Sequence, residues 1–319
     1  MDETLRETPS GAIEGRKRRG LLGELFIRLV KEKPLGVVGG VIVLLLLLVA
    51  VLASVLAPYG MNEMTLAARL DGPSFTHWLG TDNLGRDLLS RIIYGARISV
   101  YVGLLSTALG TVMATVIGLV SGFVGGKIDL FIQRIIDALL CFPPMIIVLT
   151  VIAIIGPGLW QVIFLIGLTF GYRWARIVRS AVIGIKENVY VEATRAIGVP
   201  TRRTLIQHIL PNIMAVVIVI FTVNMGQAIL LEAMLSFLGF GIPPPQPSWG
   251  GMLSGAGRQY MLQAPWMALW PGLVLAIVVY GINMLGDAVR DILDPRLRGG
   301  LGRYSGTKRK IPKLSTRAQ

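Results

Sequence analysis

The sequence predicts an all-α, polytopic membrane protein with six transmembrane helices and a helical loop on the cytoplasmic side. Its 319 residues are 53% hydrophobic and only 15% charged, with a mean hydropathy of +0.67. A soluble domain of this size carries closer to about a quarter charged residues. The charged residues are missing mainly from long uncharged runs. Such runs are long enough to span a membrane, because about 20 apolar residues suffice to cross the hydrocarbon layer. Lipid cannot hydrogen-bond to the backbone and no period-two pattern of a barrel appears, so these runs are expected to be helices.

Six spans follow from the positions of the uncharged runs. The run 138–172 is too long for one crossing, and Gly156-Pro157-Gly158 divides it where helical hydrogen bonding must break. The third span is short within its apolar limits, so it could begin earlier. Three arginines near the inner end of the fourth span are expected to extend toward the interface. The expected spans are 35–56, 99–124, 144–155, 159–182, 212–232 and 266–285.

The distribution of basic residues predicts that both termini are cytoplasmic. With the N-terminus inside, 26 of the 31 Lys and Arg fall in inner segments, as the positive-inside rule requires. This placement also accounts for the net charge of +13, which argues against nucleic-acid binding. The chain then divides into a cytoplasmic tail, a first helix, an outer connection, a five-helix core that contains the loop 186–211, and a basic cytoplasmic tail. The corresponding ranges are 1–34, 35–57, 58–97, 98–289 and 290–319.

The outer connection is expected to close with an amphipathic helix. Its apolar face lies opposite Asp87 and Arg91, and it could lie on the membrane surface or pack against the outer helix ends. The apolar face consists of Leu88, Leu89, Ile92, Ile93 and Ala96. Small residues four apart predict close helix contacts. These pairs are Gly36/Gly40, Gly118/Gly122 and Gly167/Gly171.

The inner loop 186–211 predicts a pair of short helices. Asn188 is a suitable N-cap, and Gly198 followed by Pro200 supplies a stop, which leaves a helix of about nine residues. Its apolar face consists of Val189, Ala193, Ala196 and Ile197. Thr201 can cap a second short helix that ends at Pro211. From the residues alone, the pair is either a contact for a cytosolic partner or a plain connector.

A resemblance favours the first alternative. The string Glu192-Ala193-Thr194-Arg195-Ala196-Ile197-Gly198, followed by Leu210-Pro211, resembles the EAA-type loop of permease subunits in bacterial binding-protein-dependent ABC importers. Thr194 and His208 depart from the general pattern, and the string 208–212 looks like the dipeptide, oligopeptide and nickel branch. Three further strings resemble that branch. They are 79–97, the two parts 232–239 and 243–250, and the stretch 286–298.

The resemblance implies a transport subunit and not an enzyme. In this family the loop forms a coupling helix that docks into a groove on a separate ATPase. The residues carried over to that role are Glu192, Ala193, Arg195, Ala196, Gly198, Leu210 and Pro211. The implied partners are a second homologous permease, two ATPases, a periplasmic or extracellular solute-binding protein and the lipid bilayer of the bacterial inner membrane. Dipeptides or oligopeptides are the implied solutes. Nickel or another small solute is the alternative, and an ion-coupled secondary transporter is less favoured.

Few other residues suggest chemistry. Glu232 is the only acid late in the fifth apolar run, so it is either a residue of the translocation path or gate, or a hydrogen-bond anchor at a helix end. Asp287, Asp291 and Asp294 share a helix face, where ion pairs with Arg290 and Arg296 explain them better than a metal. The sequence 125–128 lacks the pattern of a phosphate-binding loop, so ATP hydrolysis is assigned to another polypeptide. A lone Cys141 and two histidines on opposite sides predict no metal or cofactor site.

Overall fold

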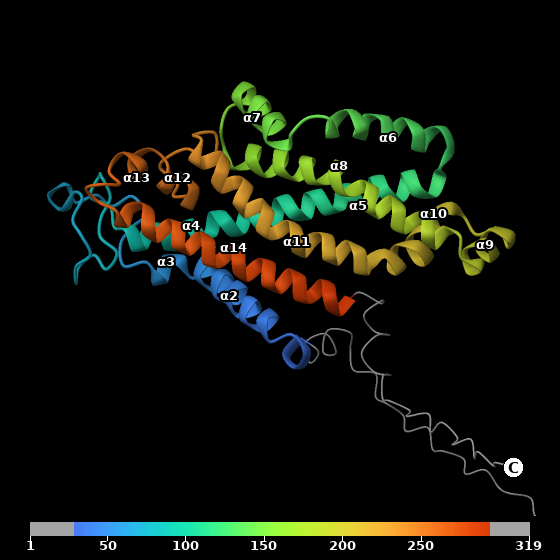
Figure 1. Cartoon of the computed structure of the whole chain (residues 1–319), viewed down its shortest axis with the longest axis horizontal. Helices are drawn as coiled ribbons and strands as arrows, with labels where there is room; N and C mark the ends of the chain where they lie inside the picture. Colours follow the sequence, from blue (N-terminus) through green and yellow to red (C-terminus); the bar gives the residue numbers. More distant parts are fainter. Residues whose placement is uncertain (1–28, 294–319) are drawn as a thin grey trace, which may run out of the picture.

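The computed structural model describes residues 29–293, and every regular element in this part is helical (Figure 1). The N-terminal and outer elements are α2 (Pro34–Val51), α3 (Ala53–Leu56), the 3₁₀ turn η1 (Leu66–Ala68), α4 (Leu88–Tyr101), the π-helical segment η2 (Val102–Ser106) and α5 (Thr107–Val124). The middle of the chain forms α6 (Gly126–Leu140), α7 (Pro144–Ile155), α8 (Leu159–Lys186) and α9 (Val189–Ala196). The last elements are α10 (Thr201–Arg203), the π-helical segment η3 (Thr204–Ile209), α11 (Leu210–Phe237), α12 (Trp249–Leu253), α13 (Gly255–Gln259) and α14 (Trp266–Leu293).

The helices fit a polytopic membrane protein. Within the described residues, four helical segments are long and apolar enough to cross a membrane: Pro34–Val51, Leu88–Val124, Thr201–Phe237 and Trp266–Leu293. The pair α6 and α7, bent by 84° at their junction, is a fifth candidate if the two helices form one span. The 28-residue α8 is long enough to cross, but it carries three arginines. The all-α class is therefore confirmed, whereas the number of six spans stays a prediction.

The second span is longer than its uncharged run. Asp87 caps α4 by accepting a hydrogen bond from the Ser90 N–H at 2.8 Å, and the helix then continues through η2 into α5. The predicted amphipathic stretch is thus the start of this helix and packs against other elements. Its expected polar side is also buried. Arg91 is 7% exposed, because the segment 57–87, here named the outer loop after its predicted side of the membrane, covers it. The Met61 carbonyl of this loop accepts from the Arg91 Nη1 at 3.0 Å.

An unexpected helix, α6, precedes the predicted third span. It lies alongside α8, and α7 continues from it after a sharp bend (Figure 1). Two ion pairs fix this arrangement: Arg179 donates to both oxygens of Asp129, at 2.6 and 2.5 Å, and Arg176 pairs with Asp137. These two arginines were expected to extend toward the membrane interface. Both pair with carboxylates of α6, and Arg179 does so through two parallel hydrogen bonds, the geometry of strong Arg–carboxylate pairs.

Close helix crossings hold the bundle together. An added Cβ at Gly118 would lie 2.6 Å from the Val178 Cβ, and one at Gly171 would lie 2.8 Å from the Met113 Cβ, so α5 and α8 approach nearly to backbone contact. The first glycine pair behaves differently. Gly36 faces the Ala288 side chain of α14 at a distance that leaves no room for a methyl group, whereas Gly40 has no neighbour nearer than 3.8 Å. The close approach of α2 to α14 therefore depends on Gly36 and not on Gly40.

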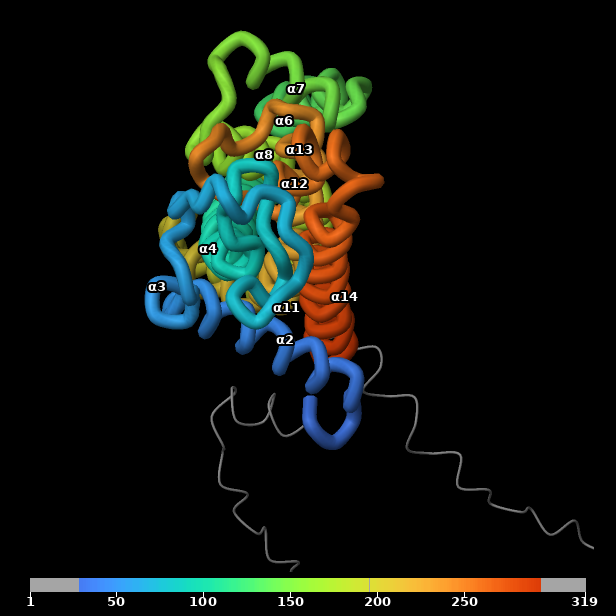
Figure 2. Tube along the Cα trace, turned by 90° about the vertical axis from the view of Figure 1, so that its left-hand side faces the viewer, coloured from blue at the N-terminus to red at the C-terminus, as the bar shows by residue number. Residues whose placement is uncertain are grey.

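The two ends of the bundle carry different features. The loop with α9 and α10 lies at one end, and the segment 57–87 with α12 and α13 lies at the other (Figure 1). Figure 2 looks onto that second end, with the segment 57–87 folded around the start of α4. The N-terminus of α2 meets the C-terminus of α14 through an ion pair of 2.6 Å between Lys33 and Asp291. Asp291 thus pairs with Lys33 at the start of α2, and residues 29–293 show no ion pair between it and Arg290. Asp294 and Arg296 lie outside the described residues.

Candidate functional site

Helix α9 projects from one end of the bundle. Its inner side is buried at Val191 and Thr194, and within the helix the Thr194 hydroxyl donates to the Val191 carbonyl at 2.7 Å. Its other side is exposed and includes several predicted coupling residues. Glu192, Ala193, Ala196 and Gly198 are all exposed, and so are the apolar Val189 and Ile197. An exposed apolar helix face at a tip of a membrane bundle is the kind of surface that a cytosolic partner covers.

Gly198 ends α9 as the sequence predicts. Its φ is +78°, in the left-handed region that side chains disfavour, and the Val199 N–H donates to the Thr194 carbonyl at 3.0 Å. This is the Schellman arrangement that closes a helix. The start of α9 differs from the prediction. The Asn188 side chain donates to the Ile185 carbonyl at 3.0 Å and so closes the end of α8. The backbone carbonyl of Asn188 accepts from the N–H groups of Val191 and Glu192 in α9.

The second predicted helix of the loop does not end at Pro211. Helix α10 begins at Thr201 and continues through η3 into α11, so that one continuous helix spans Thr201–Phe237. Proline has no N–H and its ring crowds the preceding turn of an α-helix. The π-helical segment Thr204–Ile209 widens that turn just before Pro211, which lets the helix pass through the proline. Leu210 is half-buried and Pro211 exposed, so they are the first turn of α11.

Three of the sequence strings described above pack together at the end of the bundle opposite α9. Trp249, which is buried, donates from Nε1 to the Ile92 carbonyl of α4 at 3.0 Å and packs against Gly95. Next to it, Gly250 lies against the backbone of Ala233 in α11 so closely that a side chain would overlap it. Segments 79–97, 232–239 and 243–250, which the sequence analysis singled out separately, therefore form one packed unit.

Asp82 organises the outer loop beside this unit. Its Oδ1 accepts from the backbone N–H groups of Leu84 and Arg86, at 2.8 and 3.0 Å, and its Oδ2 accepts from the Arg86 Nε at 2.6 Å. The Arg91 Nε lies 3.7 Å from the same Oδ2. Trp266 at the start of α14 donates to the Thr81 carbonyl at 3.2 Å, which ties the loop to the last span. The charged groups of this loop thus hold the start of the second span.

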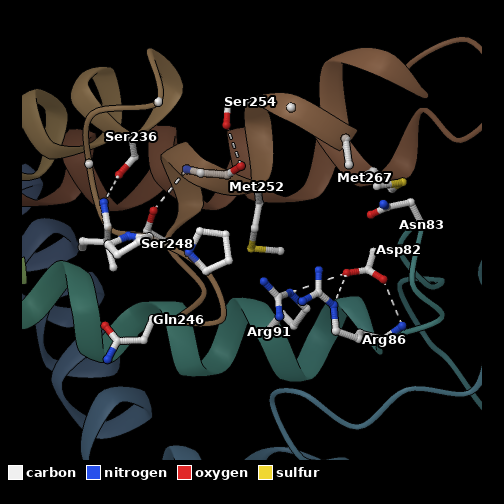
Figure 3. Close-up of a pocket in the computed structure, with 18 of the residues that line it drawn as sticks. Asp82, Asn83, Arg86, Arg91, Ser236, Gln246, Ser248, Met252, Ser254 and Met267 are labelled. Atoms are coloured by element: carbon white, nitrogen blue, oxygen red, sulfur yellow. Dashed lines mark hydrogen bonds and ion pairs between the residues drawn. The ribbon is translucent and has the colours of Figure 1, made fainter. Parts of the chain in front are cut away.

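A cavity of about 410 Å³ opens between the outer loop, the end of α11 and helices α12 and α13 (Figure 3). Asp82, Arg86 and Arg91 line one side, and Ser236, Ser248 and Met252 line the other. Sequence reasoning missed this cavity, because its walls come from four segments far apart in the chain. The only signal was the cluster of charges in the string 79–97.

Glu232 lies behind the cavity and does not line it. The side chain is fully buried, and its Oε1 accepts from the Ser236 hydroxyl at 2.6 Å. The same hydroxyl accepts from the Ile242 N–H at 3.3 Å. Glu232 thus positions Ser236 near the end of α11, and Ser236 in turn binds the segment that follows the helix. These are contacts that a hydrogen-bond anchor makes, while Oε2 has no hydrogen-bond partner among the described residues, and the choice between anchor and gate stays a prediction.

Comparisons with known proteins agree with this architecture. The family described as the binding-protein-dependent transport system inner membrane component matches residues 114–299, and the N-terminal TM domain of oligopeptide transport permease C matches residues 22–73. The dipeptide transport system permease protein DppC of Alkalihalophilus pseudofirmus is 41% identical over 275 residues, covering 86% of this chain and 90% of that protein. The chain belongs to the family of binding-protein-dependent inner membrane transport components.

Two further proteins are similar to this transport component. The glutathione transport system permease protein GsiD of Salmonella typhimurium is 42% identical over 86% of this chain and 90% of that protein. A chain of the inward-facing MetNI methionine ABC transporter has the same fold, with a TM-score of 0.52 and 19% identity over 64% of this chain and 96% of that chain. The transport component is thus a multi-pass inner membrane protein.

The predicted site residues of the transport component lie at two separate ends. The residues predicted for coupling lie in α9, in the turn after it and at the start of α11, whereas Glu232 is near the outer cavity. His77 contacts Asp87 at 3.0 Å in the outer loop, and His208 lies in η3 near α9, so the two histidines are far apart. Within residues 29–293 no three His, Cys, Asp or Glu side chains gather as metal ligands.

The anchor reading of Glu232 in this transport component predicts how substitutions behave. Glu232→Gln keeps an oxygen that can accept from Ser236, so we expect normal assembly and near-normal uptake. Glu232→Ala leaves the Ser236 hydroxyl without its acceptor, and an unsatisfied buried polar group costs about 1–3 kcal/mol. We therefore expect less folded protein on detergent size exclusion for the alanine variant. A Glu232→Gln protein that assembles normally but does not transport would favour the gate instead.

Proposed function

We propose that this chain is one of two related permease subunits of an ATP-driven importer of dipeptides or oligopeptides. Two ATPases bind on the cytoplasmic side, where both termini lie, and a solute-binding protein delivers the solute from outside. The curated relatives named for dipeptide and glutathione transport support a peptide-like solute. A small-solute importer, such as one for nickel, is the second candidate that the same family supports.

The exposed surface of α9 carries this proposal. A short helix held by buried Val191 and ended by Gly198 presents an apolar face that residues 29–293 leave uncovered. We assign the contact with the ATPase to Glu192, Ala193, Arg195 and Ala196 in α9, with Gly198 ending the helix. Leu210 and Pro211 support it from the start of α11.

The flanking helices can carry movement of α9 to the outer end. α8 has 28 residues, which is about 42 Å at 1.5 Å per residue, and the helix Thr201–Phe237 is longer still. At their far ends Pro157, just before α8, and Ser236, near the end of α11, both line the outer cavity. When the ATPases close and draw the coupling helices together, these two rods shift and change the shape of the cavity. This is how ATP binding at one face alters access at the other.

Charge reversal at Glu192 tests the proposal. Glu192 is exposed and makes no contact that holds α9 in the described structure, so Glu192→Lys is expected to leave membrane insertion unchanged. The amount of ATPase that co-purifies should fall about tenfold, which corresponds to a loss of about 1.4 kcal/mol of binding. Glu63→Lys is the matched control, because Glu63 is an exposed acid at the opposite end. Unchanged ATPase recovery with Glu192→Lys would contradict the assignment.

A further inference from the structure

The outer cavity has an excess of positive charge. Two arginines, Arg86 and Arg91, line it together with a single acid, Asp82, and the other lining residues are uncharged. Asp82 is already engaged by two backbone N–H groups and by the Arg86 Nε. The Arg91 Nε is 3.7 Å from the same carboxylate. One carboxylate therefore compensates only one of the two guanidinium groups.

Arg91 has hydrogen-bond donors to spare. Its guanidinium carries five N–H groups, and within residues 29–293 the structure assigns it one hydrogen bond, from Nη1 to the Met61 carbonyl at 3.0 Å. The residue is 7% exposed and lines the cavity, so a ligand in the cavity can reach the remaining donors. A buried and incompletely paired charge is unfavourable until an anion reaches it. A carboxylate is an anion whose two oxygens match the guanidinium geometry, and it is the anion that a peptide-like solute carries.

The opposite wall of the cavity carries adaptable apolar side chains beside Ser236 and Ser248. Met252 and Met267 line it with Ile242, and in Figure 3 the thioether of Met252 extends toward Arg91. Methionine side chains adjust to ligands of different shape. A volume of about 410 Å³ falls within the range of about 300–1,000 Å³ that is usual for small-molecule sites. The combination fits a small solute with one carboxylate and a variable apolar part.

We propose that the outer cavity binds the carboxylate of a small peptide-like solute, with Arg91 as the main contact and Arg86 beside it. This inference rests on the proposed function and names the part of the permease that receives the solute at the outer end. The bound carboxylate completes the pairing of the Arg91 guanidinium, which Asp82 compensates only in part. The adaptable methionine wall accepts different side chains, so the site selects for the carboxylate and tolerates variation elsewhere.

Cysteine chemistry in the assembled transporter tests the charge preference. Met252→Cys is introduced together with Cys141→Ser, which removes the single native cysteine of this chain. The rates of modification by an anionic and a cationic methanethiosulfonate reagent of similar size are compared in nanodiscs. The ratio of anionic to cationic rate cancels any change in accessibility. We expect Arg91→Gln to lower this ratio about threefold or more, because a positive charge near the thiol is lost. Arg91→Lys should largely preserve it.

The second arm uses dialanine and dialanine amide as protecting ligands. Dialanine should slow modification of the cysteine, the amide should protect much less, and Arg91→Gln should abolish the difference. Arg69→Gln is the matched control, since Arg69 is in the same loop but bonds to the Tyr260 hydroxyl outside the cavity. The site is refuted by an unchanged rate ratio in Arg91→Gln or by equal protection by both ligands. It is also refuted by a cysteine that reacts only after neighbouring subunits are removed, which would mean that a subunit fills the cavity. Neither readout needs ATP, so failure of the proposed function would appear separately, as absent ATP-driven uptake with the charge preference intact.

Discussion

Gly198→Leu is expected to abolish stable binding of the ATPase while the protein still inserts and folds in the membrane. Gly198 has a φ of +78°, and a left-handed conformation costs a residue with a side chain about 1–2 kcal/mol. Space is not the obstacle, since nothing lies within 4 Å of an added Cβ. The expected effect is therefore confined to the turn that ends α9. The turn either refolds or carries strain, and both change the surface that faces the ATPase.

The measurement is recovery of the ATPase with affinity-purified transporter, together with uptake in proteoliposomes. Gly184→Ala is the control, because Gly184 also has open space around it but lies within α8, where alanine is favoured. We expect Gly184→Ala to behave like the natural protein. If Gly198→Leu retains full ATPase recovery and uptake, the conformation of this turn has no part in coupling.

Gly118→Ala should have the largest effect on stability. The new methyl group would lie 2.6 Å from the Val178 Cβ and 2.9 Å from the Ala175 carbonyl, so α5 and α8 would have to separate. Overpacking of this kind costs about 1–3 kcal/mol, and the neighbouring close contacts at Gly110 and Gly122 would be disturbed with it. The loss outweighs the gain in helix propensity of about 1 kcal/mol.

Gly40→Ala is the matched comparison. It is the same substitution in a membrane helix, at a glycine whose nearest neighbour lies 3.8 Å from the added atom. We expect Gly118→Ala to lower the unfolding temperature in detergent and the yield of monodisperse protein, and Gly40→Ala to leave both unchanged. Equal behaviour of the two variants would mean that the crossing of α5 and α8 tolerates a wider spacing than the structure shows.

Local signals in the sequence predict much of the coupling surface. The stop at Gly198 is encoded in adjacent residues, because only glycine adopts the required backbone conformation without strain. The apolar runs likewise predict membrane helices, since the length of a run relates directly to membrane thickness. The glycine pairs Gly118/Gly122 and Gly167/Gly171 do mark a close crossing, although nothing in the sequence says that both pairs lie at the contact between α5 and α8.

Tertiary contacts decide what the sequence leaves open. α6 is amphipathic and charged, so hydropathy gives no reason to place it in the bundle. Its position is explained by the pairing of Asp129 with Arg179 and of Asp137 with Arg176, and by the packing of its apolar face against α8. The proline at Pro211 predicts a helix end, but a π-helical segment relieves the crowding and the helix continues. Arg91 looks like a solvent-facing residue until the outer loop folds over it. For α6 and Arg91 a distant segment reverses the local expectation, whereas at Pro211 the adjacent π-helical segment does so.

We propose that the loop 186–211 lies in the cytosol, where an ATPase binds it. Labelling with a membrane-impermeant maleimide tests it directly, using Ile197→Cys and Phe75→Cys in a Cys141→Ser background. Both side chains are well exposed, at opposite ends of the bundle. We predict that Ile197→Cys reacts in inverted vesicles and not in intact spheroplasts, that bound ATPase protects it, and that Phe75→Cys shows the reverse sidedness. Labelling of Ile197→Cys from outside intact spheroplasts would contradict the account.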